Sequence, residues 1–157
     1  MFIRKYQKGF TLLEILLVVA AIAILAGIVI FAVNPTKQLA DTRDAQRKLD
    51  TKTILSAVYQ YNVANGGIFP TTILNASDCT SPSLEICKTG ATSCTGLTDL
   101  SSSLVGIRAE FLVAMPTDPS ASTNNGTGYS IYKNPTTNRI TVCAPHTESE
   151  EMISQTN

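Results

Sequence analysis

An uncharged apolar run at residues 15–33 constrains this chain more than any other feature of its sequence. The run holds 19 residues without a charged or strongly polar side chain. A helix needs roughly 20 such residues to cross the hydrocarbon core of a membrane. Beyond Asn34 the sequence becomes polar and rich in Thr, Ser and Asn. We therefore expect a single-pass membrane anchor followed by a small soluble domain.

The charges around the apolar run predict its orientation in the membrane. Arg4, Lys5 and Lys8 precede it with no acid among them. The chain has 12 bases and 12 acids, so the part after these three bases carries a net charge of −3. Basic residues before a membrane helix hold that end in the cytoplasm. The soluble domain should face outward, and its charge gives no reason to expect nucleic-acid binding.

Glu14, immediately before the uncharged run, is hard to reconcile with an ordinary membrane signal. A carboxylate at the centre of a membrane helix is disfavoured by about 3 kcal/mol, and by less near the interface. An ordinary signal peptide, cleaved near residues 21–23 or Ala26, rarely has an acid in its apolar region. A plain anchor explains the length of the run but not the acid. Glu14 therefore predicts a function within the membrane.

The seven residues Lys8-Gly9-Phe10-Thr11-Leu12-Leu13-Glu14 resemble the class III signal of type IV prepilins and pseudopilins. In that family a short basic leader, this motif and a long apolar helix follow one another. The resemblance implies that a prepilin peptidase cleaves between Gly9 and Phe10 at the cytoplasmic face. It also implies N-methylation of Phe10 and, in a filament, pairing of Glu14 with the terminal amine of a neighbouring subunit. Gly9 suits the cleavage because it leaves the scissile bond unhindered.

Residues 36–65 have the pattern of an amphipathic helix. Asn34 and Pro35 allow two interpretations, a second helix capped by Asn34 or one long helix that is kinked or locally melted at this point. Gly66 and Gly67 predict its end. We expect the charged side chains between the apolar positions mostly to be solvated, although some could pair between subunits; Asp44, for instance, has Arg47 and Lys48 at helical pair spacing. The apolar face is predicted to comprise Leu39, Ile54, Ala57, Val58 and Tyr61.

Four cysteines, Cys79, Cys87, Cys94 and Cys143, lie in the domain expected to face outward. An even number in a small exported domain favours disulfides over free thiols. Zinc is disfavoured because the spacings do not give paired Cys-x2-Cys knuckles. Of the three possible pairings, we favour Cys87 with Cys94, which closes a short loop through Gly90, and Cys79 with Cys143.

The soluble domain is predicted to be α+β, with the helix packed on a small antiparallel sheet, as in type IV pilins. Residues 129–133 and 139–143 alternate in polarity around a turn at 134–138, which predicts a β-hairpin. Residues 108–115 could add a strand or a short helix. Residues 71–103 are predicted to form an irregular connector that is held by disulfides. Residues 146–157 are predicted to form a flexible tail.

No pattern in the sequence predicts an enzyme, a cofactor or a metal site. The single histidine, His146, lies in the polar tail, and the Gly-rich pieces lack a phosphate-loop pattern. Asp118 resembles the acid in the Pro-x-Asp-Pro turn of major secretion pseudopilins, in which a nearby loop can bind calcium. Residues 120–128 contribute no acid here, so we expect Asp118 to form a tight turn instead.

These observations and the resemblance together divide the chain into five segments. We expect a leader at 1–9, a transmembrane and filament-core helix at 10–33, an amphipathic helix half at 34–66, a disulfide-tied head at 67–145 and the tail at 146–157. The expected function is that of a subunit that polymerises into a type IV pilus-like filament. Its expected partners are other copies of itself, the prepilin peptidase, the inner-membrane assembly machinery and the membrane.

Two alternatives share the first half of this interpretation. One is a pseudopilin that forms a short periplasmic piston in a type II secretion system, and the other is a minor pilin for adhesion or DNA uptake. Four cysteines and the loop without acids favour a pilus head over a calcium-binding pseudopilin head. The subunit is expected in the inner membrane before assembly, with its N-terminus in the cytoplasm, and afterwards in an extracellular or periplasmic filament.

Overall fold

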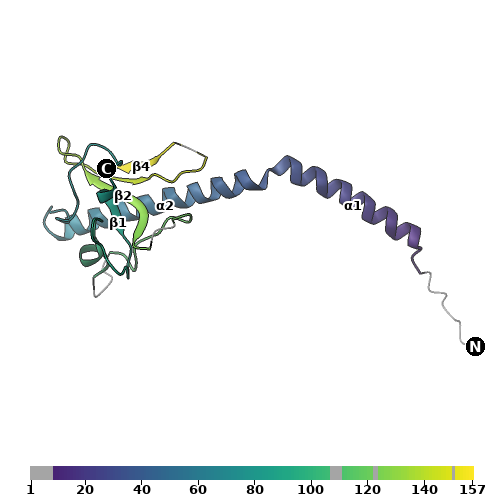
Figure 1. Ribbon diagram of the computed structural model, residues 1–157, viewed down its shortest axis with the longest axis horizontal. Helices are drawn as coiled ribbons and strands as arrows, with labels where there is room; N and C mark the ends of the chain where they lie inside the picture. Colours follow the sequence, from purple (N-terminus) through teal and green to yellow (C-terminus); the bar gives the residue numbers. More distant parts are fainter. Residues whose placement is uncertain (1–8, 107–110, 122–123, 150) are drawn as a thin grey trace, which may run out of the picture. The chain divides into compact units, whose positions relative to one another are not determined.

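The computed structural model describes residues 9–106, 111–121, 124–149 and 151–157. The chain divides into two compact units, one up to Leu39 and the other from Ala40 onward, and each is described by itself. The first unit holds helix α1 (Leu12–Val33) and the beginning of helix α2 (Pro35–Ala64). The second holds the rest of α2 and the four strands found among the described residues. Both helices are labelled in Figure 1.

Helix α1 ends at Asn34, and α2 begins at the next residue. Asn34 has a positive φ of 44°, which interrupts the helical backbone. Its side-chain oxygen accepts hydrogen bonds from the Thr36 hydroxyl at 2.7 Å and from the Lys37 amide at 3.4 Å. Pro35 occupies the first helical position, where its missing N–H leaves no bond unmade. The first of our two interpretations, a second helix capped by Asn34, is therefore confirmed.

Two glycines end helix α2, as predicted. Gly66 and Gly67 both have positive φ, at 66° and 90°. The Gly67 amide donates to the Asn62 carbonyl at 2.7 Å, which satisfies one of the orphan carbonyls of the last turn. The chain then leaves the helix and enters the head.

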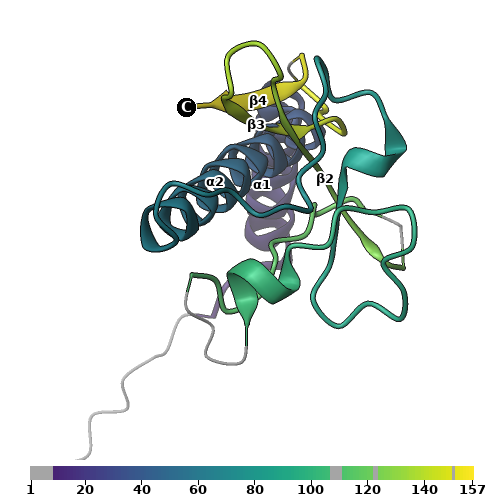
Figure 2. The ribbon, with the colours of Figure 1, turned by 90° about the vertical axis from the view of Figure 1, so that its left-hand side faces the viewer.

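The head contains one four-stranded antiparallel sheet whose order follows the chain (Figures 1 and 2). The central strands β2 and β3 form the predicted hairpin, in which Ser130 faces Cys143 and Lys133 faces Ile140. Asn134 closes the turn by accepting hydrogen bonds from two backbone amides. The strands are β1 (Glu85–Cys87), β2 (Gly126–Lys133), β3 (Ile140–Ala144) and β4 (Ile153–Thr156).

The two edge strands differ from our expectations. The segment 146–157 is not a loose tail throughout, because Ile153–Thr156 forms β4 beside β3 and buries Ile153. The other edge is β1, inside the segment expected to be irregular. We expected a strand or a short helix at residues 108–115. Residues 108–110 lie outside the described residues, and residues 111–115 form neither a strand nor a helix. Short helical turns flank β1, at Pro82–Leu84 (η1) and Ser101–Val105 (η2).

Helix α2 and the sheet enclose one hydrophobic core in the second unit (Figure 2). Ile54, Ala57 and Val58 of the predicted apolar face are buried, and Tyr61 packs against the core. Leu39 was also assigned to this face but is 58% exposed. The sheet contributes buried side chains from both hairpin strands, namely Tyr129, Ile131, Ile140 and Val142. The expected α+β class is confirmed.

Candidate functional site

The N-terminal motif leads into α1 through an extended segment. Gly9 and Phe10 are exposed and precede the helix. Thr11 is the N-cap, and its hydroxyl accepts a hydrogen bond from the Glu14 amide at 3.2 Å. Thr-x-x-Glu is the spacing of a capping box, in which the acid sits three residues after the cap. The structure thus places Glu14 in the first helical turn, four residues from the proposed new N-terminus at Phe10.

Beyond Glu14 in its first turn, the surface of α1 is apolar on every side. No residue of the helix is buried. With 22 residues, the helix is long and apolar enough to cross a membrane. Water is a poor solvent for such a surface, since each buried apolar side chain is worth about 1.5–3 kcal/mol relative to an exposed one. The helix therefore requires a lipid environment or a protein surface that packs around it.

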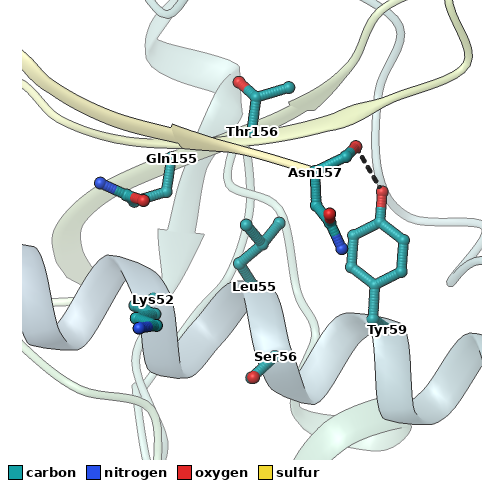
Figure 3. Close-up of a pocket in the computed structure, with 7 residues that line it drawn as sticks. All are labelled: Lys52, Leu55, Ser56, Tyr59, Gln155, Thr156 and Asn157. Carbon is teal, nitrogen blue, oxygen red and sulfur yellow. Dashed lines mark hydrogen bonds between the residues drawn. The ribbon is translucent and has the colours of Figure 1, made fainter.

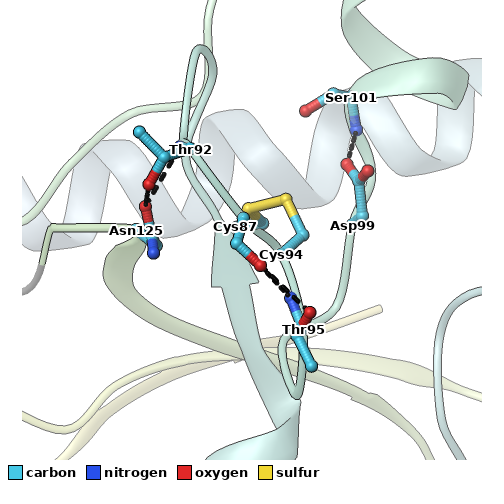
Figure 4. Close-up of a disulfide and its surroundings, with 8 residues drawn as sticks. Cys87, Thr92, Cys94, Thr95, Asp99, Ser101 and Asn125 are labelled. Atoms are coloured by element: carbon cyan, nitrogen blue, oxygen red, sulfur yellow. Dashed lines mark hydrogen bonds between the residues drawn. A yellow bond between two sulfur atoms is a disulfide. The ribbon is translucent and has the colours of Figure 1, made fainter.

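Two disulfides fasten the head, with the pairing favoured from the sequence. Cys79 is joined to Cys143 of β3, and Cys87 of β1 is joined to Cys94. The second bond closes a short loop, which Thr92 attaches to the segment before β2 by donating two hydrogen bonds to the Asn125 side chain (Figure 4). The irregular connector is thereby tied to β3 through Cys79 and to the segment before β2 through Thr92.

A buried guanidinium joins three parts of the head. Arg47 of α2 is fully buried and forms a bidentate pair with Asp118, with distances of 2.7 Å from Nε and 3.0 Å from Nη2. Its Nη1 donates to Asp44 at 2.7 Å and to Glu148 at 3.2 Å. Arg43 adds a second, half-exposed pair with Glu148. These five residues, the Arg47 cluster, connect the helix to the loop at 118–120 and to the segment after β3.

Backbone amides complete the Arg47 cluster. The Asp44 carboxylate accepts hydrogen bonds from the amides of Glu148 and Ser149, and Asp118 accepts one from the amide of Ser120. Among the described residues, no buried side-chain nitrogen or oxygen lacks a hydrogen-bond partner. A buried charge network stabilises a fold only when its members are satisfied in this way.

The electrostatics of the cluster favour its ionised form. Burial opposes ionisation of Asp44, but hydrogen bonds from Ser149, Arg47 and Glu148 outweigh it and lower the pKa of this carboxyl. Burial likewise opposes ionisation of Asp118, and hydrogen bonds from Arg47 and Ser120 lower its pKa. Hydrogen bonding to Asp118 raises the pKa of Arg47. The cluster is therefore charged at neutral pH.

A second buried polar contact lies next to the cluster. The Tyr129 hydroxyl of β2 donates to the Asp50 carboxylate of α2 at 2.7 Å. Burial and this hydrogen bond raise the pKa of Tyr129 above its ordinary value, so the phenol stays protonated. The Gln46 amide donates to the other oxygen of Asp50.

The prediction that the α2 charges are mostly solvated is wrong for Asp44, Arg47 and Asp50, all of which are buried. A signal for this burial was present in the sequence. Asp44, Arg47 and Thr51 continue the three- and four-residue spacing of Ile54 and Val58 toward the N-terminus, so they occupy the same face of the helix. Asp118 does form a turn, and both of its oxygens are engaged by Arg47 and Ser120.

Comparison with known proteins identifies the N-terminal segment. Residues 4–30 match the family model described as the prokaryotic N-terminal methylation motif. Searches of curated proteins and of solved structures returned no significant match. The chain therefore carries the N-terminal signal of type IV pilin-like and pseudopilin precursors. The head is characterised by its own structure alone.

Proposed function

We propose that this protein is a structural subunit that is processed after Gly9 and polymerises into a type IV pilus-like filament. The observation that carries the proposal is the methylation motif continuing directly into a helix whose surface, apart from Glu14, is apolar on every side. A monomer can keep such a helix only in lipid, whereas a polymer can bury it against other copies. The disulfide-fastened head then remains outside the apolar layer.

Removal of residues 1–9 would prepare α1 for this exchange of environment. It takes away Arg4, Lys5 and Lys8, the bases that hold the N-terminus in the cytoplasm. The new amine at Phe10 remains cationic after N-methylation. Glu14 supplies the opposite charge near the same end of the helix. A subunit docked in register would pair the two charges, and one docked out of register would leave both of them buried and unpaired.

The disulfides favour a pilus over a secretion piston. A filament exposed outside the cell needs heads that resist unfolding without help, and each disulfide contributes about 2–4 kcal/mol by restricting the unfolded chain. Two of them fasten this head. Asp118, the acid next to the loop that can bind calcium in major secretion pseudopilins, forms an ion pair with Arg47.

Processing at Gly9 is the first test of this function. Mass spectrometry of membrane and filament fractions should find a mature chain that begins with N-methylated Phe10. Substitution of Gly9 by a bulky residue should retain the leader and abolish filaments, because the scissile bond is then hindered. A mature N-terminus near Ile24 or Gly27 would contradict the proposal and indicate an ordinary signal peptide.

The location of the filaments distinguishes the two finer roles. Electron microscopy of cells with and without the gene, with antibody labelling of the head, should show labelled fibres on the cell surface. Labelled material confined to the periplasm, together with a loss of protein secretion in the deletion strain, would instead favour the secretion piston.

A further inference from the structure

The charges of α2 from Ala40 onward separate into two groups in the structure. Most of them have partners within the subunit, and these are Arg43, Asp44, Arg47, Lys48 and Asp50. The other two are Asp41 and Lys52, which are exposed and whose side chains form no hydrogen bond or ion pair with any other described residue. From Ala40 onward, α2 therefore presents one acid and one base whose side chains have no partner among the described residues.

Asp41 and Lys52 lie on the same face of the helix. They are eleven residues apart, which corresponds to a rotation of only about 20° around the axis and a separation of about 16 Å along it. At that separation the two side chains of one copy cannot reach each other. Two copies side by side, shifted by the same distance along the helix axis, would bring the acid of one copy to the base of the next.

The surroundings of Lys52 suit an incoming carboxylate. Lys52 borders a hollow of about 310 Å³ between α2 and β4. Ser56 and Gln155 line the same hollow and can donate hydrogen bonds, and Leu55 forms part of its wall (Figure 3). Within the described residues, no carboxylate forms an ion pair with Lys52 there. An acid of a second copy that reached this hollow would meet the ammonium of Lys52 and the possible hydrogen-bond donors Ser56 and Gln155.

We propose that Asp41 of one copy pairs with Lys52 of a neighbouring copy in the assembled filament. This inference rests on the proposed function, because it needs copies that run parallel, as the subunits of one filament would. In a parallel arrangement each copy offers Asp41 to one neighbour and Lys52 to another. Such a contact is heterologous and does not close on itself, so it propagates along a filament.

Charge exchange between the two positions tests the contact. Asp41→Lys and Lys52→Glu should each place like charges opposite one another. An exposed pair changes an association constant by about 1.4- to 5-fold, and a filament repeats the contact at every subunit. We therefore expect each single variant to reduce the number and length of filaments, and the double variant to restore them.

Arg139→Glu is the matched control. Arg139 is exposed in the hairpin turn, and this substitution changes the charge by the same amount as Lys52→Glu. Asp41→Lys combined with Arg139→Glu has the net charge of the double exchange but should stay defective. Immunoblots of the membrane fraction and proteolysis of the head should show equal amounts and equal resistance for all variants, which excludes misfolding as the cause.

The outcomes separate this inference from the proposed function. Normal filaments from both single variants, or a double variant no better than the singles, would overturn the Asp41–Lys52 contact and leave the filament function standing. Absence of filaments from the unaltered chain, in cells that process it at Gly9, would overturn both together.

Discussion

At the scale of single residues, Glu14 combines two properties that substitutions can separate. Its position three residues after the Thr11 cap suits a capping box, and its charge suits a pair with the amine of another subunit. Glutamine can serve at this position of a capping box but carries no charge. Any difference between glutamate and glutamine here therefore reports on the charge.

We expect Glu14→Gln to insert into the membrane and to be cleaved after Gly9, since the scissile bond is unchanged, but to form few or no filaments. Membrane fractionation, N-terminal mass and filament counts measure these three steps. The matched control is Thr11→Ala, which weakens the helix start by about 1 kcal/mol but keeps the charge, and should retain assembly better. Filaments of normal number and length from Glu14→Gln would show that its charge does not direct assembly.

At the scale of elements, the structure shows which contacts sequence patterns can predict. The β2–β3 hairpin was predictable because its strands alternate in polarity and are adjacent in the chain. Strands β1 and β4 have only three and four residues and are stabilised by pairing with strands formed elsewhere. A segment that short has no periodicity strong enough to identify it.

The buried charges of α2 were missed for a similar reason. Arg and Asp are almost never fully buried unless they are paired, so a charged helix position is normally assigned to solvent. The partners that bury Arg47 lie 71 and 101 residues away, at Asp118 and Glu148. Spacing along α2 could indicate the face on which Arg47 lies. Its partners could be identified only from the fold.

The Arg47 cluster joins separate elements, so Arg47→Met should destabilise the head as a whole. The substitution leaves Asp44 and Asp118 buried without their cation, and removal of one partner from a buried ion pair typically costs about 3–5 kcal/mol. Chemical denaturation of the full chain in detergent micelles should show this loss. Arg43→Met is the control, because its pair with Glu148 is partly exposed, and its effect should be much smaller.

A double-mutant cycle checks the assignment of this loss to the ion pair. Asp118→Asn removes the charge that Arg47 pairs with, so the combined variant should be more stable than the sum of the two single losses predicts. Additive losses would show that Arg47 acts through packing of its side chain rather than through its charge.

At the scale of the whole molecule, the same cluster predicts how stability depends on pH. The folded head lowers the pKa of Asp44 and Asp118 below their ordinary value of 3.8. Above pH 3.8 the two carboxyls are ionised in both the folded and the unfolded chain, and their full contribution to stability is present. As the pH falls below it, the unfolded chain takes up protons before the folded head does, so stability declines until the lowered pKa values are passed. Tyr129 sets the other limit. Its pKa is raised in the folded head, so above the ordinary value of 10.0 the unfolded chain loses this proton before the folded head does, and stability declines.

We therefore expect the free energy of unfolding to be flat between about pH 5 and 9 and to fall on both sides. Denaturant titrations in micelles across this range measure it, since α1 remains in the micelle and the transition reports on the head. Where the unfolded chain binds one proton more than the folded head, the free energy of unfolding changes by about 1.4 kcal/mol per pH unit. Asp118→Asn should be less stable at neutral pH but lose less on acidification, and Tyr129→Phe should lose less above pH 10. An acid slope that is the same for Asp118→Asn and the unaltered protein would show that the Arg47 cluster does not control the acid limit, and that other carboxylates set it.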